Sequence, residues 1–421
     1  MILKGVKRRM VERKTYVILI DAMRADYFNA IGHQGCLTPT LISLANQGTR
    51  FVNCKSPMPA VTAANHTSIM TSTNQGTHGI YGMAVHYKGL DFSHARFSRF
   101  YGTPKMDYYY HHHLEGLPTF LNIIKNNNSS AKTAIITGKH WVGEILIDES
   151  CDLLIYAGNP DNPEYCTPSE GFIRGGPRHK EDSSFPPRIY TPKKDVRFAS
   201  PPKGTIKIPF KEMNADLIPS DKWVIDQAIQ TICHEDPDFM YILLGSMDIA
   251  GHNYGSFIDT KVPNLNKLIN PDAVKDQLYI TDGEIKRFID FLKRRYTFKT
   301  SRIVIAADHG MSSMKSRKFA VDIRKVLSKH GIKIRANTRF LPYGYNDEGQ
   351  YEWCVSEGTH VYIFCREDES DKISNVLKNQ LPHLHEVIDK KEQIKRNMWK
   401  GDYQDVIWPQ IVVTLKPNYM N

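Results

Sequence analysis

The chain has 421 residues, of which 41% are hydrophobic, so it can bury a substantial core and is longer than one average domain. Its formal net charge is +10, but 45 acidic residues are scattered among the 55 lysines and arginines. This mixing excludes the long basic tract that is typical of nucleic-acid binding. A basic surface still favours anionic substrates by steering, although solubility alone also accounts for the charge.

The cysteine pattern and the apolar runs bear on the compartment. Seven cysteines lie far apart, odd in number and without a Cys-x-x-Cys pair, which argues against a disulfide framework and a thiolate zinc site. The apolar run at residues 16–20 is too short for a signal-peptide core, and about 18 consecutive apolar residues occur nowhere. We therefore predict a soluble, cytoplasmic protein without a membrane span.

Short continuous apolar segments predict parallel strands covered on both faces, at residues 16–21, 134–137, 240–244 and 302–308. Apolar residues at helical spacing predict helices between them, at 223–233 and 272–295. Strands that alternate with helices predict an α/β fold, with a doubly wound, mostly parallel sheet flanked by helices.

The texture of the sequence also predicts its division. Residues 1–150 and 222–310 form the α/β core, whereas 151–221 is rich in proline and glycine without periodicity and reads as an inserted loop region. That region either shapes a substrate mouth or has no role. Residues 311–421 form a smaller α+β cap lobe, with a helix near 321–330 and a strand at 360–365.

Acids and histidines follow several predicted strands, where ligands bind to a parallel sheet. They are Asp21, the pair Asp248 and His252, and the pair Asp308 and His309. Carboxylate oxygen and imidazole nitrogen form a mixed ligand set that zinc accepts. By contrast, the run Tyr108–His113 predicts a polar loop, because adjacent histidines do not converge on one ion.

A nucleophile is available in the segment at residues 59–66. The hydroxyl of Thr62 is a weak nucleophile that metal coordination activates at neutral pH. Asn65, one helical turn later, is placed to direct its amide at a phosphoryl oxygen. Thr62 is also suited to be the N-cap of a helix, and a helix N-terminus attracts phosphate.

Eight short segments resemble, in the same order, those of the type I phosphodiesterase/nucleotide pyrophosphatase branch of the alkaline phosphatase superfamily. They lie at residues 21–27, 38–41, 48–51, 62–66, 77–80, 236–241, 248–255 and 308–311. The resemblance covers most of the chain and implies an alkaline phosphatase-like fold. It also implies hydrolysis of phosphodiester or pyrophosphate bonds in small anionic compounds, with no nucleic-acid polymer as partner.

The same resemblance assigns roles to individual residues. It implies two zinc ions per chain, with manganese as an alternative, since these ligands suit several ions. One ion lies among Asp21, Thr62, Asp308 and His309, and the other is held by Asp248 and His252. Asn65 binds the phosphoryl group, and Thr62 attacks in line to give a phosphothreonine intermediate.

One family feature is missing from this pattern, a third histidine for the second zinc ion in a Gly-x-His-Gly-type motif after a segment like 410–419. Three explanations are open: the histidine lies beyond Asn421, another side chain such as His360 replaces it, or the second site is loose. We favour a structural role for His360, at the start of a predicted strand.

The substrate is open. Lys139 resembles one of two lysines with which phosphonoacetate hydrolases bind their substrate, whereas Trp141 stands in place of the second. Cleavage of a C–P bond is therefore an alternative to ester hydrolysis. The segment at 62–66 disfavours a sulfatase, which needs Cys/Ser-x-Pro-x-Arg, and a serine-dependent phosphoglycerate mutase. A degenerate, non-catalytic superfamily member is the alternative from another class.

Overall fold

The structure is a computed structural model of the whole chain. It describes residues 13–83, 86–87, 116–139, 142–143, 146, 150–156, 206–207, 217–218, 220–258, 271–313, 321–337, 353–399, 406–417 and 419. The Tyr108–His113 run, His140, Trp141 and most of the segment 151–221 lie outside these residues. The polar-loop prediction for 108–113 therefore stays a prediction.

The larger lobe is built on a five-stranded sheet of order β10-β1-β9-β5-β6, in which all neighbouring strands run parallel. Its strands are β1 (Thr15–Ile20), β5 (Thr133–Thr137), β6 (Leu153–Tyr156), β9 (Phe239–Leu244) and β10 (Arg302–Ala306). This parallel sheet confirms the predicted fold class. β6 was missed, because it is a four-residue strand at the start of the segment interpreted as an inserted loop.

One detail of the strand prediction was wrong. The sequence Arg302-Ile-Val-Ile-Ala306 predicted a strand buried on both faces, whereas β10 is the edge strand and Val304 is 48% exposed. An edge strand has a neighbour on one side only, so its apolar residues are less completely covered. β1 and β9, in contrast, are buried almost throughout.

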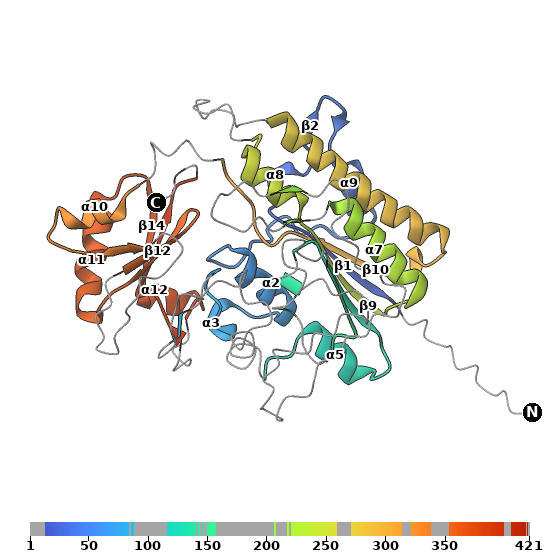
Figure 1. The fold of residues 1–421 in the computed structure, drawn as a ribbon, viewed down its shortest axis with the longest axis horizontal. Coiled ribbons are helices and arrows are strands. Elements are labelled where there is room, and N and C mark those ends of the chain that lie inside the picture. The colour runs from blue at the N-terminus through green and yellow to red at the C-terminus, as the bar shows by residue number, and fades with distance from the viewer. Residues whose placement is uncertain are drawn as a thin grey trace, which may run out of the picture.

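Helices cover both faces of this sheet (Figure 1). One layer holds the long helix α9, against which both α7 and α8 pack, and the other face carries α2 and α5. The helices of this lobe are α1 (Pro39–Gln47), α2 (Thr62–Thr71), α3 (Gln75–His78), α5 (Phe120–Asn127), α7 (Asp221–His234), α8 (Ser246–Tyr254) and α9 (Pro271–Arg294). Short 3₁₀ turns lie at Ala25–Tyr27 and Phe298–Thr300.

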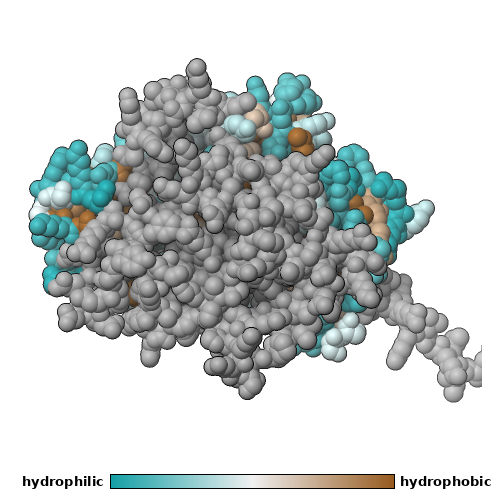
Figure 2. Space-filling view, in the orientation of Figure 1, coloured by the Kyte–Doolittle hydropathy of each residue, from teal (hydrophilic) through white to brown (hydrophobic). Residues whose placement is uncertain are grey.

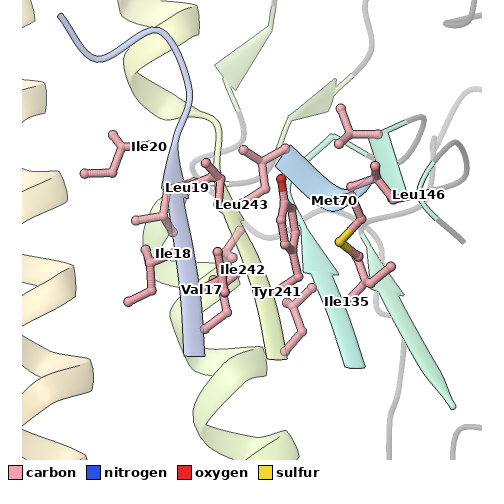
Figure 3. Packing of buried hydrophobic residues seen from close by; sticks show 14 of the residues in the cluster. Val17, Ile18, Leu19, Ile20, Met70, Ile135, Leu146, Tyr241, Ile242 and Leu243 are labelled. Atoms are coloured by element: carbon pink, nitrogen blue, oxygen red, sulfur yellow. The ribbon is translucent and has the colours of Figure 1, made fainter. Parts of the chain in front are cut away.

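The core lies between these layers. Figure 3 shows side chains of β1, β5 and β9 packed in rows, with Met70 of α2 close to Ile135. On the α9 side, Phe288 meets the ring of Tyr16 edge-on, with centroids 5.5 Å apart. Tyr241 of β9 extends its hydroxyl toward the end of the sheet at which the strands finish, near α2.

The smaller lobe contains a second sheet, of order β11-β12-β13-β16-β14. Its elements are β11 (Arg335–Asn337), β12 (Trp353–Glu357), β13 (His360–Phe364), β14 (Leu384–Asp389) and β16 (Ile411–Leu415), with helices α10 (Ile323–Ser328), α11 (Glu367–Gln380) and α12 (Lys390–Lys395). Three two-stranded ladders complete the described part: β2 (Ile31–Gly32) with β3 (Gly35–Cys36), β4 (His86–Tyr87) with β15 (Val406–Ile407), and β7 (Ile206–Lys207) with β8 (Leu217–Ile218).

Alternate residues of β13 face two different cores. Val361 and Ile363 pack beneath the cap helices, whereas Tyr362 and Phe364 join the core of the larger lobe. This period of two is what a strand between two apolar layers requires. The Tyr362 hydroxyl donates to the carbonyl of Tyr81, and the Tyr81 hydroxyl donates to the carbonyl of Ile407. The two lobes therefore share a packed interface.

The visible described surface is mainly hydrophilic over the outer helices of both lobes (Figure 2). Among the described residues, no helix is long and apolar enough to cross a membrane.

Glycine at position 76 permits a close approach between the lobes. Its N–H donates to the carbonyl of Asn397 over 2.9 Å, and an added Cβ would stand 2.4 Å from that oxygen. We expect Gly76→Ala to lower the free energy of unfolding by about 1–3 kcal/mol, because backbone atoms would have to move. Urea denaturation measures the change.

Gly283→Ala is the matched control, since Gly283 lies in α9 and an added Cβ would meet nothing within 4 Å. Alanine is the better helix former, so this variant should gain roughly 0.5–1 kcal/mol. Equal stability of the two variants would contradict the close approach at Gly76.

Candidate active site

The candidate site lies where four parallel strands end. Asp21 follows β1, Lys139 follows β5, Asp248 lies in α8 just after β9, and Asp308 follows β10. The carboxyl ends of parallel strands meet at one edge of a sheet, so residues far apart in sequence converge there. All four side chains are buried.

Asp308 is fixed through one carboxylate oxygen and open through the other. Its Oδ1 accepts the N–H groups of Ala22, over 3.1 Å, and of His309, over 2.8 Å. Ala22 has φ of 58°, a left-handed conformation that a non-glycine residue rarely adopts. Oδ2 has no hydrogen-bond partner among the described atoms, and neither has Asp21 Oδ1.

His309 connects the predicted nucleophile to these carboxylates. Its Nδ1 lies 3.0 Å from the carbonyl oxygen of Gly310, which can only accept, so Nδ1 carries a proton. In the neutral ring Nε2 then presents a lone pair, 2.9 Å from Thr62 Oγ1. Nε2 also lies 3.6 Å from Asp21 Oδ1 and 3.3 Å from Asp308 Oδ2. Thr62, Asp21, Asp308 and His309 thus lie in one cluster, and their role as metal ligands stays a prediction.

Thr62 is the first residue of α2, and Asn65 lies one turn further along the same helix. The N-cap prediction for Thr62 was wrong by one residue, because Val61 takes that position. The first backbone N–H groups of a helix have no partner within it, so Thr62 stands beside potential anion donors. The Asn65 amide donates to the backbone carbonyl of Asp308 over 2.8 Å. Asn65 therefore holds α2 against the turn after β10, and its predicted role in phosphoryl binding stays a prediction.

Lys139 lies between two carboxylates. Its Nζ is 2.6 Å from Asp21 Oδ2 and 2.6 Å from Asp248 Oδ2. The turn that carries it is closed by Thr137, whose hydroxyl accepts the Lys139 N–H and donates to the Lys139 carbonyl. The Lys139 side chain is only 4% exposed, so its ammonium is buried with these two carboxylates and is not solvated.

The second predicted pair of ligands, Asp248 and His252, also lies close together. Asp248 and His252 lie four residues apart in α8, and Oδ1 of Asp248 is 3.4 Å from Nε2 of His252. His252 is exposed, with 40% of its side chain accessible. The pair has the spacing that one helical turn gives, but its ligand role stays a prediction.

Sequence reasoning gave no role to His66, a buried member of this cluster. Its Nδ1 is 2.6 Å from the Tyr241 hydroxyl, and its Nε2 is 3.5 Å from Asp308 Oδ2. Burial lowers the pKa of His66 to about 4 and raises that of Tyr241 well above its usual value, so both are neutral at pH 7. If the Tyr241 hydroxyl donates to Nδ1 of His66, the proton of the neutral ring lies on Nε2. That N–H then points at the Asp308 carboxylate and holds the carboxylate in place. The signal in the sequence was the four-residue spacing from Thr62.

Burial and charge oppose each other in this cluster. Burial raises the pKa of Asp21, and the neighbouring Asp308 adds to the effect, although Lys139 opposes it. Burial also disfavours ionised Asp248, but the Lys139 ammonium and His252 outweigh it and hold its pKa below the usual range. A bound divalent cation would become the largest local charge and would favour ionised Asp21.

The donor set fits a divalent metal ion. Ligand atoms of Asp21, His66 and Asp308 lie within 4.8 Å of one another, as do those of Asp21, Asp248 and His309. A buried carboxylate oxygen without a partner is costly, and a cation would satisfy it. Oxygen and imidazole ligands suit zinc, manganese and related ions, so the ligands alone do not choose among them.

His360 begins β13 and pairs with Glu357 and Thr414 in the second sheet. This position suits the structural role favoured from the sequence. The third ligand of the second predicted site is not identified within the described residues.

The fold and the site together define an α/β protein that gathers potential metal ligands at the carboxyl ends of parallel strands. The sequence matches the family Type I phosphodiesterase / nucleotide pyrophosphatase over residues 15–420, so the chain belongs to that family. This confirms the resemblance read from the ordered motifs and makes the protein a hydrolase acting on phosphoester bonds. The comparison with curated proteins gave no match.

Solved structures support the same fold. Murine ectonucleotide pyrophosphatase/phosphodiesterase 5 is 17% identical, with a TM-score of 0.54, and the match covers 97% of this chain and 80% of that one. An inactive variant of it, in complex with AMP, gives a TM-score of 0.55 at 16% identity, with the same coverage. Phosphonoacetate hydrolase from Sinorhizobium meliloti 1021, in complex with phosphonoacetate, gives 0.56 at 16% identity, covering 97% and 82%.

Removing the Tyr241 hydroxyl tests its bond to His66. Tyr241→Phe should lower the free energy of unfolding by about 1–3 kcal/mol, because a buried imidazole nitrogen loses its partner. Chemical denaturation measures the change. Tyr279→Phe, at a half-exposed position of α9, is the control and should shift stability by less than about 0.5 kcal/mol. Equal changes in both variants would argue against the buried bond.

Proposed function

We propose that this protein hydrolyses phosphodiester or pyrophosphate bonds of small anionic substrates at a site with two divalent ions, zinc or manganese, and that Thr62 is the nucleophile. The observation that carries the proposal is the position of Thr62, at the start of α2 and 2.9 Å from the Nε2 atom of His309. The family and the partner-free buried carboxylate oxygens support it.

The proposed ligands divide into two groups. Asp21, Thr62, Asp308 and His309 would hold one ion, and Asp248 with His252 would contribute to the other. Bound divalent ions lower the pKa of a coordinated hydroxyl and stabilise charge on phosphoryl oxygens. His66 is not among these ligands; its proposed role is to hold the Asp308 carboxylate in position.

The chain's own residues supply position and charge. Thr62 attacks the phosphorus in line, which forms the Oγ1–P bond, breaks the bond to the leaving group and yields phosphothreonine. Water then attacks that phosphorus and restores the hydroxyl. The amide N–H groups in the first turn of α2 have no partner within the helix and can bind a phosphoryl oxygen. Asn65 holds the helix against the turn that carries Asp308.

Two other functions are kept open by particular observations. Phosphonoacetate hydrolase has the same fold, which supports a C–P bond substrate. Its lysine-based binding of a carboxylate is not the arrangement observed here, because Lys139 contacts Asp21 and Asp248. A degenerate, non-catalytic protein is the other alternative, because no third ligand of the second ion is identified among the described residues.

Replacing the nucleophile is the first test of the mechanism. Thr62→Ala should reduce hydrolysis of a nitrophenyl ester of thymidine monophosphate by more than about 10³-fold, since the attacking atom is lost. Thr62→Ser should retain part of the activity. Thr71→Ala removes a hydroxyl from the same helix, one that bonds the Thr67 carbonyl, and should stay near wild type. Equal activity of Thr62→Ala and wild type would rule out the route.

A substrate panel separates the remaining candidates. We expect the diester bis-p-nitrophenyl phosphate and the thymidine ester to be cleaved faster than p-nitrophenyl phosphate or phosphonoacetate, with all turnover lost on metal removal. Preference for phosphonoacetate would favour C–P cleavage instead. If none of the four compounds is hydrolysed by protein whose metal sites are verified to be full, the non-catalytic alternative is favoured.

A further inference from the structure

The ammonium of Lys139 already supplies a positive charge where the two predicted metal sites adjoin. It contacts one oxygen of Asp21 and one oxygen of Asp248, each over 2.6 Å. The remaining oxygens face other groups: Asp21 Oδ1 lies 3.6 Å from His309 Nε2, and Asp248 Oδ1 lies 3.4 Å from His252 Nε2. Lys139 therefore stands between the two groups of ligands.

We propose that Lys139 makes the two metal sites unequal: its ammonium competes with the second divalent ion for Asp248, so that the ion beside Asp308 binds first and more tightly. This inference rests on the proposed function for the existence of the two sites. It adds the order in which they fill and names the residue that sets it.

The number of available ligands differs between the sites. On the side away from Lys139, Asp21 Oδ1 and Asp308 Oδ2 are buried without a hydrogen-bond partner in the described structure, and His309 Nε2 lies beside them. On the other side lies Asp248, one oxygen of which contacts Lys139, with the exposed His252 beside it. The further described donors within reach of Asp248 are Asp21 and His309, which the first ion already uses. A first ion therefore gains three donors without disturbing Lys139.

Charge balance points the same way. With an ion bound and all three groups ionised, the buried carboxylates Asp21, Asp248 and Asp308 carry three negative charges, and the Lys139 ammonium offsets one of them. The net charge of two is matched by a single divalent ion. A second ion would leave excess positive charge in a buried site, which is unfavourable unless Lys139 leaves Asp248 or an anion enters.

The same balance links the second ion to the substrate. A phosphoryl group brings negative charge into the site, so an anion and the second ion should each strengthen binding of the other. Such coupling is reciprocal by thermodynamic linkage and typically amounts to about 5–150-fold in affinity. Inorganic phosphate is a simple probe of this effect.

The test is a zinc titration of the full chain, against a chromogenic chelator and with native mass spectrometry to count bound ions. Wild type should bind one ion tightly and a second at least about tenfold more weakly. Lys139→Met and Lys139→Gln should tighten the second ion roughly tenfold and leave the first in place. Phosphate should also tighten the second ion in wild type.

Two control variants show whether the charge is responsible. Lys139→Arg keeps the positive charge and should leave the second ion weak. Lys125→Met removes a lysine of α5 that pairs with Asp152 outside the site, over 2.7 Å, and should change neither affinity. If the neutral variants at position 139 do not fold, the inference is tested by the two zinc affinities of the wild type and by the effect of phosphate on the weaker one.

The possible results separate this inference from the proposed function. Two ions of equal affinity in wild type, or no change in the neutral variants, would overturn the competition by Lys139 and leave a two-metal hydrolase standing. Absence of any bound ion would overturn both. A weak second ion that tightens only when the ammonium is removed or phosphate is added supports the inference.

Discussion

The burial of three carboxylates at the ends of adjacent strands is the constraint on which the site depends. Ionised groups of one sign do not share a buried space unless positive charge accompanies them. In this protein Lys139 provides part of that charge, and backbone N–H groups fix one oxygen of Asp308. The oxygens that remain without partners define where a cation fits. The same few side chains therefore affect both the stability of the fold and the chemistry of the site.

The sheet explains why these groups can meet at all. Asp21 and Asp308 are 287 positions apart in the chain, yet β1 and β10 are hydrogen-bonded neighbours that end at the same edge. Helix α2 brings Thr62 to that edge from the opposite layer, and Asn65 attaches the helix to the turn after β10. Among the described residues, the contacts within this cluster involve none from the smaller lobe.

Much of the fold and of the candidate site could be predicted from the sequence, and each wrong or missing prediction has a physical cause. Apolar runs identified β1, β5 and β9 because buried parallel strands show no alternation, whereas the same signal overstated the burial of β10. The edge position of a strand depends on sheet order, which local sequence does not encode. The ordered motifs located the cluster around Asp308. They did not reveal Lys139 between Asp21 and Asp248, because a side-chain ion pair depends on tertiary distance.

The edge position of β10 has a consequence for how long a bound ion would remain. Among the described strands, β10 pairs only with β1, and the residues that follow it supply Asp308 and His309. Edge strands open locally more easily than central ones, because fewer contacts must break. Transient opening of β10 would withdraw two donors together, so ion release would follow the opening rate of this strand. A cation that joins β1 to β10 would in turn slow amide hydrogen exchange along that edge.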